Sequence, residues 1–406
     1  RLIDMLKQKG CGIIYISHNM DESLRISDDI TVMRDGQWVA TRPAKELTME
    51  EIIKLMVGRE LTNRFPPKTN KPGDVILDVQ HIAGKYTRLK DATFQLRKGE
   101  VLGIVGESGS GKSVTSLSIM GLLQHPGRGV DGEIFFQDQH ILSYGKRRMR
   151  RVRGKEIAMI FQDPMTSLNP VYTVGNQIME MLQEHEDIGK GEAKRRAIEM
   201  LRMVGIPSPE KRIHNYPHEF SGGMRQRAMI AIALACSPKL LIADEPTTAL
   251  DVTIQAQILN LIKRLNRELD MTTILITHDL GVVATLCDKV VVMYGGLIME
   301  DGTVEEIFYH PKHPYTMGLI DSIPSVTGGE KQRLKPIPGT PPNLIHPPKG
   351  CPFSTRCPYC MNVCMEEMPP YFQEDGHRTM CWLLHEEAPV NPEYVQRKEA
   401  MRRADG

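Results

Sequence analysis

With 406 residues, the chain is long enough for two or three domains, each with its own hydrophobic core. Its 51 Lys and Arg residues nearly balance its 50 Asp and Glu residues, so the net charge of +1 gives no reason to expect nucleic acid or an acidic surface as a partner. The longest apolar stretch, residues 228–243, contains Pro238 and Lys239 and is shorter than a membrane span. We therefore expect any contact with a membrane to depend on a partner protein.

The first 60 residues repeat a sequence that lies 260 positions further on. Gly12–His18 (GIIYISH) aligns with Thr272–His278 (TTILITH). Three pairs of identical residues keep this offset: Asp28 and Asp288, Met33 and Met293, and Gly36 and Gly296. Both copies predict a helix, a buried strand, a Ser/Thr-His turn, a short helix, a strand and a Gly turn.

We therefore expect residues 1–62 to be the tail of a second, related domain that lacks a phosphate-binding loop. His18 would then lie in a turn with no nucleotide site of its own. The chain opens on Arg1, within the predicted helix, and has no initiator Met. This leads us to expect a fragment or a rearranged gene.

Residues 63–74 lie in a stretch rich in Pro, Asn and Lys that predicts a linker. Alternating apolar and polar residues predict strands over Val75–Val79 and Ala92–Leu96, and further strands are expected at 134–136 and 157–161. Helices are expected at 173–184 and 191–204. The basic run 146–155 has no interleaved aromatic residues, so a solvated helix face or loop is favoured over a nucleic-acid site.

The segment Gly106–Ser113 (GESGSGKS) fits the phosphate-binding pattern G-x-x-x-x-G-K-[ST]. A predicted strand, Val101–Val105, precedes it, and a predicted helix, Lys112–Leu123, follows it. Phosphates would then sit at a helix N-terminus, where unpaired N–H groups favour negative charge. The candidate phosphate-binding residues are Gly106, Glu107, Ser108, Gly109, Ser110, Gly111, Lys112 and Ser113, the last of which would also bind Mg²⁺.

Two further segments predict parts of a nucleotide site. An apolar strand beginning at Lys239 ends in Asp244 and Glu245, of which the first is the candidate metal ligand and the second the candidate general base. Ser221, Gly222 and Gly223 begin a predicted helix and form a second candidate anion-binding loop. The residues alone do not say whether this loop and Gly106–Ser113 meet in one molecule.

In order along the chain, these segments resemble an ABC-type ATPase domain over about residues 74–310. The resemblance includes Gln162, Ala249-Leu-Asp251 and His278. Four tracts resemble the ATP-binding subunits of oligopeptide/dipeptide importers: FQDPMTSLNP (161–170), FSGGMRQR (220–227), ADEPTTALDVT (243–253) and ITHDLGVVA (276–284). By contrast, ISHNMDE (16–22) and TMEEIIKLMVGREL (48–61) resemble the end of the first ATPase half of a sugar-type importer subunit. A genuine fusion, a relic and a mis-joined gene all stay open.

The resemblance implies an α/β P-loop NTPase fold, with a mixed sheet and a helical subdomain over residues 75–310. It implies a head-to-tail dimer that binds ATP between the phosphate-binding loop of one subunit and the Ser221–Gly223 loop of the other. Ser113, Gln162 and Asp244 would bind Mg²⁺. His278 would contact the γ-phosphate, and Asp251 would bridge the dimer. Tyr86 is the candidate for stacking on adenine, and Met224 departs from the Gln of many ABC proteins.

Five of the eight cysteines fall in the last part of the chain, which follows a Pro-rich stretch at 335–350. The spacing Cys351-x5-Cys357-x6-Cys364-x16-Cys381, with Cys360 in addition, is compatible with zinc, an iron–sulfur cluster or buried thiols. The tracts HPYTMGLIDSIP (313–324) and GTPPN (339–343) resemble the C-terminal extension of peptide-importer ATPases, which we place at 311–406. In that family the four matching cysteines bind a [4Fe–4S] cluster, so the resemblance implies the same cofactor here.

We expect an ATPase subunit that energises peptide uptake from the cytoplasmic face of the membrane. Its expected partners are a second ATPase subunit, two membrane permease subunits and an extracytoplasmic peptide-binding protein, with no direct contact to nucleic acid. One alternative is a soluble ABC ATPase that acts on nucleic acid or ribosomes, although the 109 residues from Lys112 to Ser221 hold neither a zinc module nor a coiled coil. The other is an inactive relic, if residues 1–62 disturb 75–96.

Overall fold

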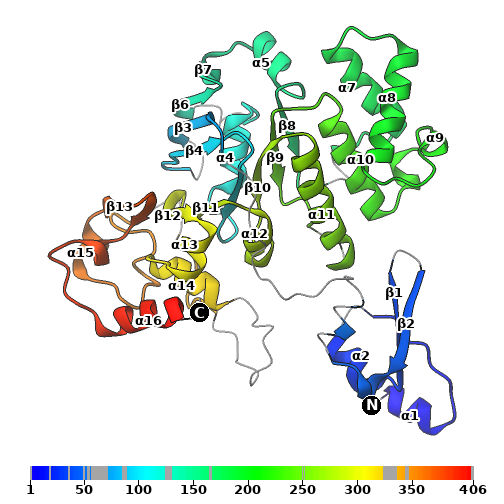
Figure 1. Cartoon of the computed structure of the whole chain (residues 1–406). Helices are drawn as coiled ribbons and strands as arrows, with labels where there is room; N and C mark the ends of the chain where they lie inside the picture. The colour runs from blue at the N-terminus through cyan, green and yellow to red at the C-terminus, as the bar shows by residue number, and fades with distance from the viewer. Residues whose placement is uncertain are drawn as a thin grey trace.

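The architecture was analysed on a computed structural model and rests on three β-sheets within the described part of the chain (Figure 1). The described residues are 2–17, 20–34, 37–48, 51, 52, 55, 72–84, 89–123, 130–163, 167–248, 250, 252–322, 336–342 and 347–403. A two-stranded sheet lies in the N-terminal segment. A four-stranded and an eight-stranded sheet form the body that holds the nucleotide-site motifs.

The N-terminal segment repeats later elements at the offset of 260 residues. Its elements are α1 (Leu2–Gln8), α2 (Met20–Ile26), β1 (Asp29–Arg34), β2 (Gln37–Pro43) and the 3₁₀ turn η1 (Ala44–Glu46). The later copies of α2, β1 and β2 are α12 (Leu280–Leu286), β11 (Lys289–Tyr294) and β12 (Leu297–Thr303). Both hairpins are antiparallel and both shift register at the same place, between Val32 and Met33 and between Val292 and Met293.

One predicted strand of this repeat does not form. Residues 11–17 have no regular structure, and Ile14 and Ile16 are each 93% exposed. The matching residues form the buried strand β10 (Thr272–Ile276), which is hydrogen-bonded on both sides. A parallel strand takes its hydrogen bonds from its neighbours. The prediction of a buried strand at 12–16 was therefore wrong, because no strand within the described residues pairs with this stretch.

The eight-stranded sheet has the order β13-β14-β12-β11-β5-β10-β9-β8. Its strands not yet given are β5 (Val101–Val105), β8 (Ile157–Ile160), β9 (Leu240–Asp244), β13 (Tyr371–Glu374) and β14 (His377–Met380). The five strands from β11 to β8 run parallel, and the other three pair antiparallel at one edge. The parallel strands place their carboxyl ends, where the candidate site residues lie, at one edge of the sheet.

The four-stranded antiparallel sheet has the order β4-β3-β6-β7. Its members are β3 (Val75–Gly84), β4 (Phe94–Arg97), β6 (Val130–Phe136) and β7 (Gln139–His140). The strand expected from Ala92 thus begins two residues later, and the one expected to end at Val79 continues to Gly84. Strands β3 and β4 pair antiparallel from Val75 opposite Arg97 to Val79 opposite Phe94.

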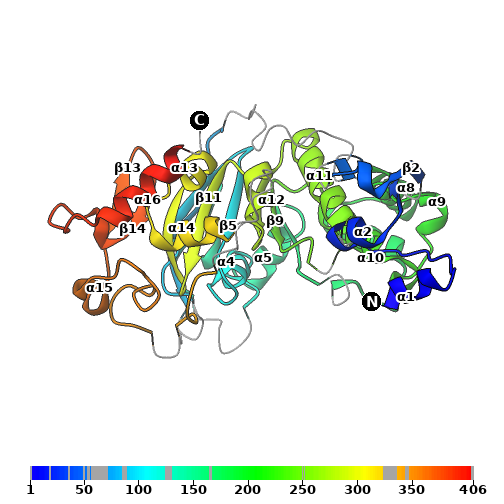
Figure 2. The ribbon, with the colours of Figure 1, turned by 90° about the horizontal axis from the view of Figure 1, so that it is seen from below.

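The helices between β5 and the end of α13 fall into two groups (Figures 1 and 2). The first group contacts the sheets and comprises α4 (Lys112–Ile119), α5 (Lys146–Val152), α11 (Val252–Glu268), α12 and α13 (Val304–Tyr309). The second lies beyond the β8 edge and comprises α7 (Val174–His185), α8 (Lys190–Met203), α9 (Pro209–Arg212) and α10 (Gly222–Leu234). The basic run becomes the exposed helix α5, as expected for a solvated face.

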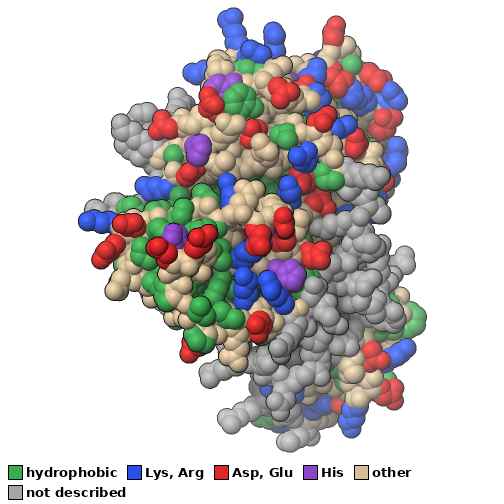
Figure 3. Space-filling model, turned by 60° about the vertical axis from the view of Figure 1, so that its left-hand side comes forward, with side chains coloured by type: hydrophobic (Ala, Val, Ile, Leu, Met, Phe, Trp, Pro, Cys, Tyr) green, Lys and Arg blue, Asp and Glu red, His purple; other side chains and the backbone are tan. Residues whose placement is uncertain are grey.

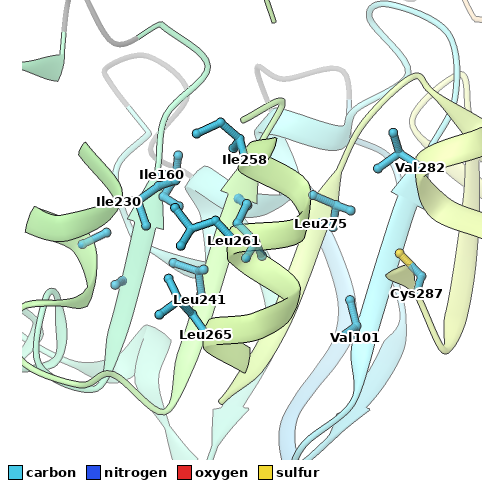
Figure 4. Packing of buried hydrophobic residues seen from close by; sticks show 14 of the residues in the cluster. Val101, Ile160, Ile230, Leu241, Ile258, Leu261, Leu265, Leu275, Val282 and Cys287 are labelled. Atoms are coloured by element: carbon cyan, nitrogen blue, oxygen red, sulfur yellow. The ribbon is translucent and has the colours of Figure 1, made fainter. Parts of the chain in front are cut away.

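The core lies between the parallel strands and the helices. Figure 4 shows Leu261 and Leu265 of α11 packed towards Leu241 of β9, all of them at most 5% exposed. The apolar spacing along α11 matches the 3.6-residue helical period, so one face of the helix is buried against the sheet. This packing fixes the carboxyl end of β9, where Asp244 and Glu245 lie.

The segment expected to form a C-terminal extension joins the same sheet within its described residues. It contains α14 (Pro314–Asp321), α15 (Asn362–Glu366), β13, β14 and α16 (Pro392–Arg403). Strand β14 pairs with β12 and so continues the sheet of the ATPase motifs. Figure 3, turned towards this side of the molecule, shows acidic and basic side chains interspersed over the surface. Within the described ranges, every helix is too short or too polar to cross a membrane.

Candidate functional site

The phosphate-binding loop connects the central strand β5 to α4, as the sequence predicts. Three of its glycines have positive φ angles: Gly106 (149°), Gly109 (80°) and Gly111 (110°). A Cβ atom on Gly106 would lie 2.1 Å from the backbone oxygen of Met293, so only glycine fits there. The loop leads directly into the N-terminus of α4, and helix N-termini favour bound phosphate.

Lys112 is folded back onto the loop. Its Nζ donates to the backbone oxygens of Gly106 (2.8 Å) and Glu107 (3.0 Å), and its side chain is buried. Burial lowers the pKa of Lys112, while the nearby carboxylates of Glu245, Asp244 and Glu107 act in the opposite direction. Phosphate oxygens would be stronger acceptors than the two carbonyls, because hydrogen bonds to charged partners are the stronger ones.

Two candidate oxygen ligands for Mg²⁺, Ser113 and Asp244, lie side by side. The Ser113 hydroxyl donates to Asp244 Oδ1 at 3.1 Å, and Asp244 is buried at the end of β9. Burial raises the pKa of Asp244, although the hydrogen bond from Ser113 opposes this. Mg²⁺ prefers such hard oxygen ligands and is often held by one carboxylate together with substrate phosphates. This pair of residues therefore fits the metal that the sequence predicts.

Glu245 is the point at which three segments meet. Its Oε2 accepts from Gln162 Nε2 (3.0 Å) and from the Thr248 hydroxyl (2.9 Å), and lies 3.5 Å from His278 Nδ1. The backbone φ of Glu245 is 46°, a conformation that costs a non-glycine residue energy and that recurs at active sites. The imidazole of His278 is 68% exposed, so it is free to meet a ligand. The structure thus gathers Gln162, Glu245 and His278 beside Asp244.

Comparison with known proteins identifies the family. Residues 89–248 match the ABC transporter family, and residues 299–364 match the C-terminal region of oligopeptide/dipeptide transporters. An oligopeptide transport ATP-binding protein, OppD of Bacillus subtilis (strain 168), is 55% identical over 329 residues, which cover 80% of this chain and 92% of that protein. The chain belongs to the family of ATP-binding subunits of oligopeptide/dipeptide ABC transporters.

Other relatives support the same assignment to this family of peptide-transporter ATPase subunits. The dipeptide transport ATP-binding protein DppD of Bacillus subtilis (strain 168) is 51% identical, over 77% of this chain and 96% of its own length. Among solved structures, the ATP-binding cassette MJ0796 in a post-hydrolysis state with ADP and Pi matches with a TM-score of 0.51 and 26% identity. That match covers 56% of this chain and 98% of the cassette. The ABC ATPase fold expected from the sequence is confirmed.

The second candidate anion-binding loop lies apart from the first in this peptide-transporter subunit. Ser221 caps α10, and its hydroxyl accepts from the Met224 N–H at 3.4 Å. Figure 1 places α10 with α7 and α8, whereas the phosphate-binding loop opens α4 on the other side of the sheet. Gly222 and Gly223 form the first turn of α10. The candidate residues His18, Tyr86 and Asp251 lie outside the described residues.

The cysteine motif of the extension is brought together but does not form a ready ligand set. The Cys351 N–H donates to the Cys364 backbone oxygen at 2.8 Å. Burial, reinforced by the neighbouring thiols, raises the pKa of Cys351 to about 12 and that of Cys357 to about 12. Burial likewise raises the pKa of Cys381, with Cys351, Cys357 and Cys364 contributing. Burial of Cys351, Cys357 and Cys381 thus disfavours their thiolate forms.

A metal or cluster needs thiolates rather than thiols. Within the described residues, no three Cys, His, Asp or Glu side chains are arranged closely enough to hold a metal ion, the cysteine motif included. The present arrangement of the four thiols therefore gives no support to the expected [4Fe–4S] cluster.

Sequence patterns did not predict two contacts made by Glu107. Arg356 Nη1 lies 2.6 Å from Glu107 Oε2, and the Glu107 N–H donates to the Tyr315 hydroxyl at 2.9 Å. A usable signal was present, because a carboxylate within a loop that binds phosphates calls for a compensating cation. The sequence does not indicate which of its 51 Lys and Arg residues supplies that cation.

Proposed function

We propose that this chain hydrolyses ATP to energise the uptake of oligopeptides or dipeptides by an ABC importer. The 55% identity to an oligopeptide transport ATP-binding protein, across 92% of that relative, carries the proposal. The match of residues 299–364 to the C-terminal region of oligopeptide/dipeptide transporters supports it independently, because that region lies outside the ATPase motifs. A soluble ATPase acting on nucleic acid or ribosomes has no comparable support.

Within this function, the phosphate-binding loop, Gly106–Ser113, holds the polyphosphate of ATP, with the Glu107 carboxylate turned away from it and paired with Arg356. Ser113, Asp244 and Gln162 would hold Mg²⁺, which neutralises charge on the β- and γ-phosphates when it is bound. Glu245 accepts the proton of the attacking water, and Gln162 and Thr248 orient its Oε2 for this step. His278 donates to the γ-phosphate. The convergence of three of these residues on Glu245 Oε2 supports these roles.

A second ATPase subunit completes the site in this proposal. The separation of Ser221–Gly223 from the phosphate-binding loop within one chain supports a composite site, in which the signature loop of each subunit faces the ATP of the other. Asp251 would bridge the two subunits, and Tyr86 would stack on adenine. Two permease subunits and an extracytoplasmic peptide-binding protein complete the importer, with this chain bound peripherally on the cytoplasmic face of the membrane.

Co-purification tests this function directly. The chain is expressed with candidate permease and second ATPase subunits, reconstituted into vesicles and supplied with peptides of graded length. ATP-dependent uptake of peptides is the expected result, and it should cease with Glu245→Gln in this chain. A complex that hydrolyses ATP but transports no peptide would refute the proposed substrate. A chain that binds no ATP would refute the ATPase assignment.

We further propose that the cysteine motif takes up a [4Fe–4S] cluster through Cys351, Cys357, Cys364 and Cys381, with Cys360 as a neighbour that does not ligate. The proximity of the four side chains supports this, since Cys351, Cys357 and Cys364 all lie close enough to Cys381 to act on its thiol. Iron and sulfide analysis of anaerobically purified protein is the test. Finding zinc, or no metal at all, would contradict the cluster.

Residues 1–62 are, in our proposal, the tail of a sugar-type ABC ATPase domain, and 63–74 link it to the ATPase domain at 75–310. The matching positions of α2, β1 and β2 with α12, β11 and β12 support the first part. Deletion of residues 1–62 should leave ATP turnover intact. A collapse of turnover would show that the segment is integral to the ATPase.

A further inference from the structure

Glu107 places a negative charge inside the loop that must receive the phosphates of ATP. Its side chain is 27% exposed, and its own backbone oxygen accepts from Lys112 at 3.0 Å. An unpaired carboxylate at this position would repel polyphosphate and would compete with it for Lys112. The loop therefore needs a positively charged side chain that neutralises Glu107 and keeps its carboxylate turned away from the space for the phosphates.

Arg356 of the C-terminal extension supplies this positive charge. Its guanidinium pairs with both oxygens of Glu107, at 2.6 and 3.0 Å, and its side chain is only 3% exposed. The remaining guanidinium N–H groups donate to the Tyr294 hydroxyl (3.1 Å) and to the backbone oxygens of Pro338 (2.9 Å) and Ile337 (3.1 Å). Since all five donors of the fork have acceptors, the orientation of Arg356 is fixed before nucleotide arrives.

A second residue of the extension holds the backbone of Glu107. The Tyr315 hydroxyl on α14 accepts from the Glu107 N–H at 2.9 Å. Its ring is fully buried and packs against the rings of Tyr294 (centroids 4.6 Å apart) and Phe353 (5.3 Å). Side chain and main chain of Glu107 are thus both held by residues that follow it by 249 and 208 positions.

We propose that Arg356 and Tyr315 are positioning residues for ATP binding: through Glu107, the C-terminal extension neutralises and orients the phosphate-binding loop of its own chain. This inference rests on the function proposed above. It gives the extension a part in the nucleotide site, beyond any role in peptide transport or in binding a cofactor. It also explains how the loop tolerates a carboxylate as its second residue.

The test is equilibrium binding of MgATP to the full chain. Arg356→Gln is expected to raise the Kd about tenfold, because one charge-assisted pair is lost and Glu107 is left as an unpaired anion. Adding Glu107→Gln to that variant removes the lone carboxylate and should restore at least about half of the lost affinity on a logarithmic scale. Rescue of this kind is not expected if Arg356→Gln acts only by unfolding the extension.

Two further variants separate positioning from folding. Arg378→Gln breaks another ion pair of the extension, the largely buried pair of Arg378 with Asp301, whose contacts do not include the loop. The Kd of this variant for MgATP should stay within about twofold of that of the unmodified chain. Tyr315→Phe keeps the buried ring and removes only the acceptor. It should raise the Kd about threefold and speed hydrogen exchange of the Glu107 amide.

These measurements distinguish failure of the inference from failure of the proposed ATPase function. An unchanged Kd for Arg356→Gln would overturn the inference and leave the ATPase function standing. So would a loss that Glu107→Gln fails to rescue, or an equal loss in Arg378→Gln. Failure of the unmodified chain to bind MgATP would overturn both the function and the inference that rests on it.

Discussion

Glu300 offers a quantitative test of how the C-terminal extension is attached to the ATPase domain. It lies in β12, and its side chain is wholly buried. Its carboxylate accepts from the backbone N–H groups of Lys312 (2.6 Å) and His313 (3.1 Å) and from His377 Nε2 (2.7 Å), and the Thr379 hydroxyl lies at 3.4 Å. One side chain thus joins the sheet to the start of α14 and to β14.

Replacement of Glu300 by Ala would leave these donors buried without an acceptor. Stranded buried donors cost about 1–3 kcal/mol each, and removal of the carboxylate strands several of them at once. Because these contributions overlap, we expect a loss of about 4 kcal/mol in the free energy of unfolding of the extension. Glu300→Gln keeps one carbonyl oxygen as an acceptor and should lose about 2 kcal/mol.

Tryptophan fluorescence gives a direct assay. The chain has only two tryptophans, Trp38 in the N-terminal segment and Trp382 in the extension. In a Trp38→Phe background, urea unfolding followed by fluorescence reports on Trp382 alone. With a urea dependence of about 2 kcal/mol per molar, a loss of about 4 kcal/mol lowers the midpoint by about 2 M.

The matched control breaks an exposed ion pair instead. Arg202 and Glu210 are both more than half exposed, so Arg202→Ala should cost no more than about 1 kcal/mol. A midpoint for Glu300→Ala no lower than that of the control would refute the argument, because the buried network would then contribute nothing to the attachment of the extension.

Three further predictions concern the nucleotide site. Glu245→Gln should lower ATP hydrolysis about 10²–10⁴-fold while ATP binding persists, as measured by phosphate release and nucleotide titration; unchanged turnover would remove Glu245 as the base. Burial raises the pKa of Asp244, so the folded chain binds a proton on this carboxylate more tightly than the unfolded chain does. The free energy of unfolding therefore falls as the pH rises above 3.8, the ordinary pKa of an Asp side chain. In the absence of nucleotide, Asp244→Asn should therefore raise the Tm at pH 7, and this gain should disappear as the pH falls towards 3.8. The same variant should weaken Mg²⁺-dependent ATP binding. A lower Tm at pH 7 would contradict the expected direction of the stability change. Gly106→Ala should abolish ATP binding, because the added Cβ would lie 2.1 Å from the backbone oxygen of Met293. The control Gly145→Ala adds a Cβ in open space and should bind ATP normally. Equal ATP binding by both variants would contradict the steric argument.

The parts of the site that the sequence predicted are those encoded within a few residues. Strand β5 has the bounds expected for Val101–Val105, and the strand that begins after Lys239 ends at Asp244 as expected. Each depends on a local pattern: an apolar run followed by a glycine-rich loop, or an apolar run followed by two carboxylates. Such patterns place residues at strand ends, and parallel strands bring those ends together.

Contacts between distant segments could not be predicted in this way. Arg356 is 249 residues from Glu107, and no local pattern assigns one to the other. The N-terminal repeat also shows that a local sequence pattern does not determine which strands form. Ile274 and Ile276 are buried in β10, whereas Ile14 and Ile16, in the matching positions, are exposed. The local sequence is alike in both copies, and only the presence of neighbouring strands differs.

The joining of β14 to β12 has a consequence for how the chain is made. Until β14 arrives, β12 is an edge strand with unpaired backbone groups, which are a template for aggregation. Residue 377 is synthesised 74 residues after residue 303, a delay of about 4–15 s at ordinary rates of translation. During that interval the nascent ATPase domain has an open sheet edge. The arrival of β14 covers Glu300 and Asp301 of β12 and moves the edge of the sheet to the short strand β13.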